Sequence, residues 1–330
     1  MVSLSEVRAS NARIAKDTAP HTAIFTGATD GIGKATLTRL VSAKLPIKIY
    51  VIGRNGDKHK RLLDELRKSN DKADIFWLEG QISLLAEVQR LCDEIKARET
   101  SIDLLFMSAG FIRSGGREET IEGNEIGRSL CYYGRILFIT QLLPLLNASS
   151  NNPRILSILA AGNESSSIPL DDLDLKKPEN FGLVSSSKSA ATHTTLSMLK
   201  LAQENPRVIF IHHYPGGVKT DLFKKVWGEK WWWWLFAPLL AMAGTSPEDA
   251  GEKAVYLLTS SKYGGKGVPL SASERPGLTM AKTKEVGSLF NINEKVQELY
   301  QEKVMADLNR MDAGAIVWRK TLETLKPYSS

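Results

Sequence analysis

Apolar, β-favouring runs recur along the first two thirds of the chain, and stretches with helical spacing of apolar residues separate them. We predict strands at 22–26, 47–52, 74–78, 102–107, 153–159 and 207–213. Strands that alternate with helices form parallel sheets, because each connecting helix packs back on one face of the sheet. The pattern predicts an α/β fold with a single doubly wound parallel sheet and helices on both faces.

The last part of the chain has a different pattern. Residues 263–277 are rich in glycine, proline and serine, and two stretches with helical periodicity follow, at 292–308 and 315–325. In the first of these, four apolar residues recur at the spacing of one helix face: Val296, Leu299, Tyr300 and Val304. That spacing predicts one buried face, so we expect a helical extension that docks on the preceding domain.

We therefore divide the chain into three parts. Residues 1–20 form a helical lead-in, residues 21–262 form a nucleotide-binding domain, and residues 263–330 form the C-terminal helical extension packed on that domain. Within the domain, residues 221–246 are expected to form a lid or substrate segment.

A glycine-rich segment joins the first predicted strand to the first helix. Glycines let the backbone turn sharply and approach a pyrophosphate closely, and the free amides of the helix N-terminus attract the anion. An ordinary strand-to-helix turn can carry the same glycines, so this signal needs support from elsewhere. The residues expected to contact a cofactor here are Thr26, Gly27, Thr29, Asp30, Gly31, Ile32 and Gly33.

The end of the second predicted strand supports the nucleotide reading. It reads Gly53-Arg54-Asn55, close to the expected ~20 residues beyond the glycine loop. An acidic residue there would bind a ribose 2′-hydroxyl, whereas Arg54, with Lys58 and Lys60 nearby, suits a 2′-phosphate through charge-assisted hydrogen bonds. We predict NADP(H) as the cofactor, with contacts from Arg54 and Asn55; the alternative is a solvated arginine at a strand end.

Composition excludes several classes of function. The 330 residues carry a formal net charge of +6, but the 43 basic and 37 acidic residues are interspersed, which does not indicate a nucleic-acid partner. Two cysteines, Cys92 and Cys131, make neither a disulfide framework nor a metal site. We therefore expect no metal ion. The charged N-terminal segment does not resemble a signal peptide, so we expect a cytoplasmic protein.

A run of four tryptophans, Trp231 to Trp234, begins an apolar stretch that ends at Gly244. At roughly 14 residues this stretch is too short to span a bilayer. Adjacent tryptophans cannot all face one side of a helix, so some meet solvent, ligand, partner or lipid. Three roles stay open: a lid packed on the core, a lid that faces the substrate, and a peripheral membrane contact assisted by Lys224, Lys225 and Lys230.

Four segments in order resemble the short-chain dehydrogenase/reductase superfamily over roughly residues 20–262. Two are the glycine loop and Gly53-Arg54; the others are Met107-Ser108-Ala109-Gly110, similar to the family's NNAG strand end without its asparagines, and Pro215-Gly216-Gly217-Val218-Lys219-Thr220, similar to its PG-x-V-x-T segment. The resemblance implies a Rossmann-type fold and cofactor contacts from Ala109, Gly110, Lys188, Pro215, Gly216, Val218 and Thr220. Details such as Tyr132-Tyr133-Gly134-Arg135 are similar to a divergent fungal branch associated with secondary metabolism.

The family's catalytic group is a tyrosine, a lysine, a serine and an asparagine, and only the lysine is matched, by Lys188. The tyrosine position holds Val184, the serine position Ala160 and the asparagine position Cys131. Neither Val184 nor Ala160 has a side chain that can hydrogen-bond a carbonyl. A slip in the alignment would let one of Ser165, Ser166 and Ser167 supply a hydroxyl.

Other residues are candidates for the lost proton donor. Tyr214 ends the sixth predicted strand, which in this fold lies beside the nicotinamide, and Lys188 is a cation that would lower its pKa. The alternative is that Tyr214 only packs there. Tyr132 and Tyr133 are further candidates, of which at most one can point at the site, because adjacent helical residues diverge.

Two more groups of titratable residues need an interpretation. His212 and His213 lie on an apolar strand, so we expect one of them to pack under a helix. The run Asp171-Asp172-Leu173-Asp174 is interpreted as a solvated loop, with a carboxylate base there left open.

Two classes of function remain. The first is an NADP(H)-dependent oxidoreductase that reduces a carbonyl or a conjugated double bond of a hydrophobic small molecule, with Lys188 and Tyr214 as its catalytic residues. The second keeps the fold but not hydride transfer, as a non-redox cyclase or isomerase or as a binding or scaffold protein. We favour the reductase, because the glycine loop, Arg54, Lys188 and residues 215–220 would have little reason to persist together without a dinucleotide. A homo-oligomer stays open.

Substituting Arg54 by Asp should shift the preference from NADPH toward NADH, because a carboxylate repels a 2′-phosphate and accepts a hydrogen bond from a 2′-hydroxyl. The ratio of the two dissociation constants checks this. An unchanged ratio would refute the role assigned to Arg54.

Overall fold

The computed structural model describes residues 2–111, 115–151, 153–220, 244–272, 274–278 and 289–329. The tryptophan run Trp231–Trp234 and most of the expected lid segment lie outside the described residues.

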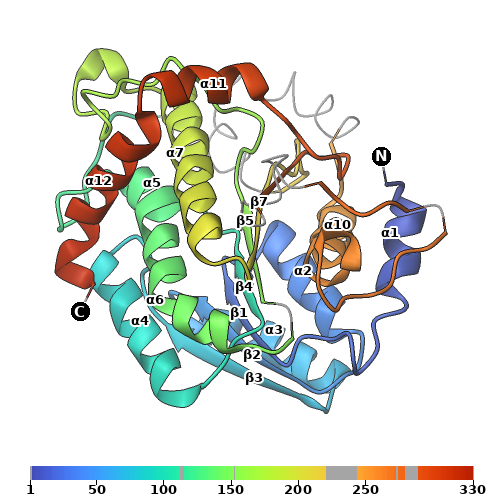
Figure 1. Ribbon diagram of the computed structural model, residues 1–330. Coiled ribbons are helices and arrows are strands. Elements are labelled where there is room, and N and C mark those ends of the chain that lie inside the picture. Colours follow the sequence, from blue (N-terminus) through green and yellow to red (C-terminus); the bar gives the residue numbers. More distant parts are fainter. Residues whose placement is uncertain are drawn as a thin grey trace, which may run out of the picture.

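One parallel sheet of seven strands forms the centre of the described structure, in the order β3-β2-β1-β4-β5-β6-β7 (Figure 1). The strands are β1 Thr22–Thr26, β2 Ile47–Gly53, β3 Ala73–Glu79, β4 Leu104–Met107, β5 Arg154–Ile158, β6 Ile209–His213 and β7 Leu289–Ile292. The strand order reverses between β1 and β4, and ligands of such sheets bind beyond the carboxyl ends of the strands at that reversal. The doubly wound parallel sheet predicted from the sequence is confirmed.

Helices cover both faces of the sheet (Figure 1). One apolar core joins the sheet to four helices and the shorter α11: α4 Leu85–Arg98, α6 Gly134–Ala148, α7 Leu183–Glu204, α12 Ala313–Leu325 and α11 Glu302–Arg310. The core on the other face joins it to α1 Leu4–Asn11, α2 Gly31–Val41, α3 Gly56–Ser69 and α10 Pro247–Thr259. Shorter helical turns are α5 Ile126–Arg128, η1 Ser129–Tyr133, η2 Pro178–Asn180, η3 Ser261–Tyr263 and η4 Lys326–Tyr328.

The turn after β7 corrects the first part of the helix predicted over residues 292–308, whereas α11, Glu302–Arg310, confirms its last part. β7 pairs with β6, and the chain then turns, with Ile292 bridging to Glu298. The Asn293 Oδ1 atom accepts hydrogen bonds from the N–H groups of Lys295 and Gln297, a local turn that competes with a helix. Val296 lies in this turn with a φ of +56°, and its side chain is buried. The apolar spacing of residues 296–304 therefore does not come from one helix face.

The helical stretch Ile126–Ala148 is the one candidate span in the described part of the chain that is long and apolar enough to cross a membrane. Within its apolar window, 67% of the residues are buried inside the molecule. Most of this stretch is α6, which packs between α4 and α7 against the sheet and therefore belongs to the core.

Buried hydroxyl groups attach the C-terminal helix α12 to the core. The Tyr132 hydroxyl lies 2.7 Å from Ser197 Oγ on α7 and 2.5 Å from Thr321 Oγ1 on α12. Asp174, in the loop before α7, forms an ion pair with Lys320 at 3.2 Å. These contacts connect η1, α7 and α12 into one polar cluster within an apolar surrounding.

Replacing Thr321 by Val should lower the free energy of unfolding by about 1–2 kcal/mol, because the buried Tyr132 hydroxyl loses a partner. Thr324→Val on the same helix is the matched control: the Thr324 hydroxyl is only partly buried and bonds to Lys320 O, so its loss should stay below about 0.5 kcal/mol. Urea denaturation of both variants measures the difference. Equal losses would contradict a special role for the buried cluster.

Candidate functional site

The glycine loop lies where the β1 and β4 main chains converge. Gly27 has a φ of +78°, and a Cβ atom at this position would overlap the backbone of Ala109, coming within 2.6 Å of its Cα. Ser108 Oγ donates to Gly27 O at 3.1 Å, which holds the two strand ends together. The predicted segments Thr26–Gly33 and Met107–Gly110 therefore share one edge of the sheet.

The other glycines of the loop are equally confined. A Cβ on Gly31 would lie 2.8 Å from Thr220 Cγ2, and a Cβ on Gly33 would lie 2.6 Å from Ser108 Oγ. Gly31 thus brings the 215–220 segment against the N-terminus of α2, as a shared cofactor site requires. Asp30 caps α2, because its Oδ1 accepts the Gly31 N–H at 2.8 Å. Its side chain therefore orders the loop, whatever contact it makes with a ligand.

Arg54 is exposed at the end of β2 in a loop that Trp77 on β3 supports. The indole ring fills the space beside Gly53 and lies 2.8 Å from a Cβ built on Gly56, so a side chain at either position would displace Trp77. The Asn55 side chain accepts the Lys58 N–H at 3.0 Å and so caps α3. The loop thus presents the Arg54 side chain to solvent beside the N-terminus of a helix, a location that favours an anion.

Lys188 and Tyr214 do not form the bonded pair that a direct replacement of the family's tyrosine would show. Lys188 is exposed in the second turn of α7, and Tyr214 is half-buried just after β6, with its N–H donating to Ile292 O. In the described part of the chain neither side chain forms a hydrogen bond or ion pair. Val184, at the position expected for the tyrosine, is 65% exposed in the first turn of α7.

The structure removes two other candidate donors. The Tyr132 and Tyr133 side chains are both buried, and the Tyr133 hydroxyl donates to Asp174 at 2.6 Å. Burial raises the pKa of Tyr132 to about 12. Both hydroxyls are thus hydrogen-bonded on the side of the molecule that faces α12, so neither is available as a proton donor in the candidate site. Cys131 lies beside them on η1, a π-helical turn, and burial raises the pKa of its thiol.

The alternative hydroxyls after β5 belong to an ordered loop. Ala160 is buried, and the Ser165 hydroxyl accepts the Ser167 N–H at 3.2 Å. Ser165 N donates to Thr192 Oγ1 on α7 at 3.0 Å, which ties this loop to the helix.

The aspartate run is not the solvated loop that the sequence predicted. Asp172 is buried and accepts hydrogen bonds from the N–H groups of Lys176 and Lys177. Asp174 lies 3.3 Å from Arg128 Nε as well as near Lys320. Of the three aspartates, Asp171 is exposed and pairs with Lys177. These carboxylates order the chain before α7, because cations and amides surround them.

Both strand histidines are buried. His213 Nδ1 lies 3.1 Å from Ile292 O, and His212 Nε2 accepts the Ala160 N–H at 3.3 Å. His212 Nδ1 lies 2.9 Å from Thr195 Oγ1 on α7, which confirms that one histidine packs under a helix. Burial, together with the positive charge of Arg135, lowers the pKa of His212 to about 3, so this ring is neutral at pH 7.

A row of buried polar residues crosses the α6 and α7 face near the carboxyl ends of the strands, and of its members only His212 was predicted from the sequence to pack under a helix. It consists of Arg135, Ser157, His212, Thr195, Glu164 and Asn291. The Glu164 carboxylate accepts hydrogen bonds from Thr195 Oγ1 at 2.6 Å and Asn291 Nδ2 at 2.9 Å. One signal was available: Arg135 is the single charged residue of the apolar helix α6.

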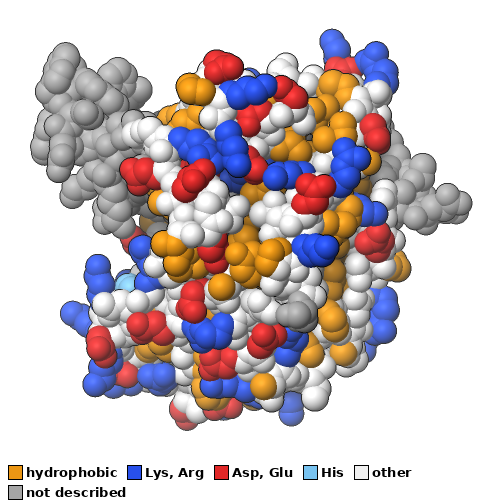
Figure 2. Space-filling view, turned by 90° about the vertical axis from the view of Figure 1, so that its left-hand side faces the viewer, with side chains coloured by type: hydrophobic (Ala, Val, Ile, Leu, Met, Phe, Trp, Pro, Cys, Tyr) orange, Lys and Arg blue, Asp and Glu red, His pale blue; other side chains and the backbone are white. Residues whose placement is uncertain are grey.

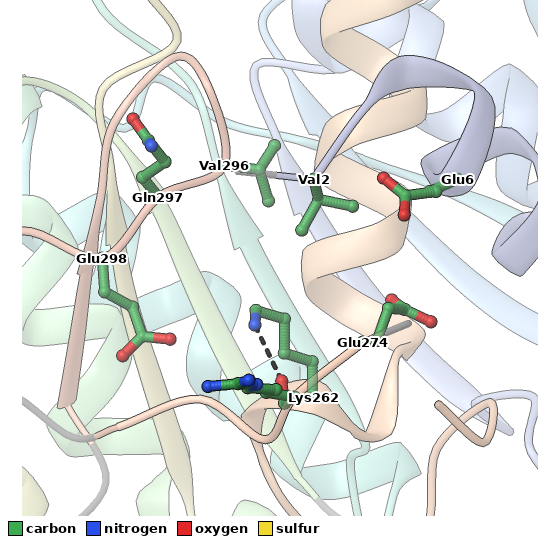
Figure 3. A pocket seen from close by; sticks show the side chains of 8 residues that line it. Val2, Glu6, Lys262, Glu274, Val296, Gln297 and Glu298 are labelled. Atoms are coloured by element: carbon green, nitrogen blue, oxygen red, sulfur yellow. Dashed lines mark hydrogen bonds between the residues drawn. The ribbon is translucent and has the colours of Figure 1, made fainter. Parts of the chain in front are cut away.

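A hollow of about 330 Å³ lies away from these residues, between α1, η3 and the turn after β7 (Figure 3). Its wall is mixed in charge and contains none of the predicted site residues: Val2, Glu6, Lys262, Glu274, Arg275, Val296, Gln297 and Glu298. Lys262 Nζ donates to Arg275 O at 2.9 Å across its floor. On the face shown in Figure 2, acidic and basic side chains are interspersed, as in the sequence.

Comparisons with known proteins agree with this geometry. The family profile described as short chain dehydrogenase matches residues 21–160. Oxidoreductase AN1596 of Emericella nidulans is 36% identical over 331 residues, covering 97% of this chain and 97% of the relative. The short-chain dehydrogenase/reductase SAT2 of Stachybotrys chartarum is 28% identical over 351 residues, covering 98% and 97%. The NADPH-bound carbonyl reductase from chicken fatty liver has a similar fold, with a TM-score of 0.54, 16% identity, and coverage of 85% and 98%.

Replacing Gly33 by Ala should destabilise the fold by about 1–3 kcal/mol and abolish nucleotide binding, because the methyl group would collide with Gly27 O and Ser108 Oγ. Gly314→Ala on α12 is the control, since among the described residues its Cβ would meet no atom within 4 Å. Thermal unfolding and NADPH titration of both variants test this. Normal nucleotide affinity in Gly33→Ala would refute a role of the glycine loop in nucleotide binding.

Proposed function

This chain belongs to the short-chain dehydrogenase/reductase superfamily, and on that premise we propose that it is an NADP(H)-dependent reductase of a hydrophobic small molecule. Its substrate would carry a carbonyl group or a conjugated double bond. The observation that carries the proposal is the close packing of the glycine loop at the carboxyl edge of β1 and β4. A Cβ at Gly27, Gly31 or Gly33 would collide with neighbouring protein atoms, so only glycines allow this loop to form the cradle in which the dinucleotide would lie.

The residues present fit a dinucleotide phosphate. The N-terminus of α2 and the adjoining Thr220 would hold the pyrophosphate, and the exposed Arg54 would hold the 2′-phosphate. The further contacts implied by the family come from Ala109, Gly110, Pro215, Gly216 and Val218. NADPH, when bound, supplies the hydride.

The remaining chemistry falls to the chain's own side chains. In this proposal Lys188 binds the cofactor ribose and provides positive charge at the start of α7. Tyr214 holds the proton that the substrate oxygen receives. Tyr214 suits this role because it is half-buried at the end of β6 and, within the described residues, its hydroxyl has no hydrogen-bond partner that would occupy it.

The proposal includes a role in fungal secondary metabolism. The sequence resemblance to that branch supports it, and both relatives named above are fungal proteins. An apolar substrate also fits the exposed side chains Leu183 and Val184 at the start of α7, where the family has its tyrosine.

A second function is favoured by one observation: Val184 and Ala160, which stand at the positions that the resemblance assigns to the tyrosine and the serine, have no hydroxyl group. A protein that uses the fold as a non-redox cyclase or isomerase, or as a scaffold, would show this loss. Calorimetric titration with NADPH, NADH and NADP⁺ separates the two. Saturable, NADPH-selective binding supports the reductase, whereas no binding of any nucleotide supports the second function.

Replacing Tyr214 by Phe should reduce turnover of a carbonyl substrate by about 10²-fold or more, because the proton donor is lost. The dissociation constant of NADPH should stay unchanged, since the phenyl ring keeps its place. Tyr328→Phe, at the C-terminal end, is the control and should retain full turnover. Steady-state kinetics with a screened carbonyl substrate measure both; normal kcat in Tyr214→Phe would eliminate Tyr214 as the donor.

A further inference from the structure

Arg135, in the first turn of α6, places a guanidinium group under the carboxyl ends of two strands. The residue is only 4% exposed. Its NH1 atom donates to Ser157 Oγ at 2.7 Å and to Ile158 O at 2.8 Å, and its NH2 atom donates to Ala109 O at 2.7 Å. One side chain thus joins the end of β4 to the end of β5.

No acid neutralises this cation within the described part of the chain. All three acceptors are uncharged, and Arg135 Nε is buried without a hydrogen-bond partner. Burial lowers the pKa of Arg135. An arginine keeps its proton in proteins, so the site has a standing positive charge beneath it.

The buried carboxylates of neighbouring elements are engaged elsewhere. Glu164 accepts from Thr195, Asn291 and Gly162 N, toward β7. Glu125 accepts from Gly127 N and Arg128 N at the start of α5. His212, which pairs with Ser157 in the sheet, is neutral at pH 7 and cannot offset the charge.

From this geometry we infer that Arg135 biases the site toward the reduced cofactor and toward substrates that become anionic at oxygen when they accept a hydride. The inference rests on the proposed function, in which the end of β6 lies beside the nicotinamide. Ile158, whose carbonyl oxygen accepts a hydrogen bond from Arg135, pairs with His213 at that strand end. The oxidised nicotinamide ring is cationic and the reduced ring is neutral, so a buried positive charge disfavours only the oxidised form. The same charge stabilises a developing oxyanion.

This electrostatic bias selects the substrate class. Hydride transfer from NADPH forms a C–H bond and leaves NADP⁺, while the π-electron pair of the carbonyl moves to oxygen; in a conjugated carbonyl it reaches oxygen as an enolate. A proton then completes the alcohol or the saturated carbonyl compound. Ketones, aldehydes and enones place negative charge on oxygen in this way. An isolated C=C bond does not, so it is excluded as the reducible group.

The test measures dissociation constants of NADPH and NADP⁺ by calorimetry, without a substrate. The two nucleotides differ only at the nicotinamide, so the ratio of the NADP⁺ constant to the NADPH constant reports the charge effect. We expect the ratio to fall by about tenfold in Arg135→Met and to be retained in Arg135→Lys, which keeps the charge but cannot reach both strand ends.

The fold provides a matched control at the opposite end of β5. Arg154 is also fully buried and donates to two main-chain oxygens, Leu257 O at 2.9 Å and Gly264 O at 3.0 Å. Arg154→Met removes an equally buried cation far from the carboxyl edge, so the ratio should stay at its wild-type value. If the ratio of dissociation constants also falls in Arg154→Met, the effect comes from general instability and the inference is overturned.

Other outcomes are equally decisive. Wild-type protein that binds NADP⁺ as tightly as NADPH overturns the inference while leaving NADP(H) binding, and with it the proposed function, intact. This comparison needs no variant, so it stands even if Arg135→Met does not fold. If the ratio falls equally in Arg135→Lys and Arg135→Met, the effect comes from the geometry of the strand ends and not from the charge, and the inference is overturned. Binding of neither nucleotide overturns the proposed function and this inference together.

Discussion

The close approach of the β1 and β4 main chains at Gly27 is the constraint on which the candidate site depends. Only a residue without a Cβ fits against Ala109, and its left-handed backbone conformation aims the loop at the N-terminus of α2. The same confinement applies at Gly31 and Gly33, so the cradle is built from main chain. A site built in this way keeps its shape when the side chains around it change.

Beneath the cradle, the protein accepts buried polar groups that a purely apolar core would avoid. Arg135, His212 and Glu164 lie in a row across β4 to β7, each supplied with hydrogen bonds from neighbouring strands or α7. Each neutral donor or acceptor that stayed buried without a partner would cost about 1–3 kcal/mol of stability. Their hydrogen bonds hold the strand ends in position. Arg135, the cation among them, makes the electrostatic potential beneath the site positive.

The C-terminal part of the chain contributes to the same architecture. β7 extends the sheet beside β6, and α12 meets η1 through Thr321 and Tyr132. The π-helical turn that carries Cys131 is thereby held between the site and the C-terminal helix. Tyr132 and Tyr133 serve this attachment, which explains why two tyrosines near a candidate active site are unsuited to proton transfer.

The sequence by itself determined the first six strands, the glycine loop and the position of Arg54, because these depend on short-range apolar periodicity and on local backbone demands of glycine. Only the tertiary structure decided the rest. The strand at Leu289–Ile292 forms because an edge of β6 was available to it, and four residues carry too little periodicity to show this. The partners of Asp174 and Arg135 come from other elements, so the burial and charge of these two residues depend on contacts that no local pattern encodes.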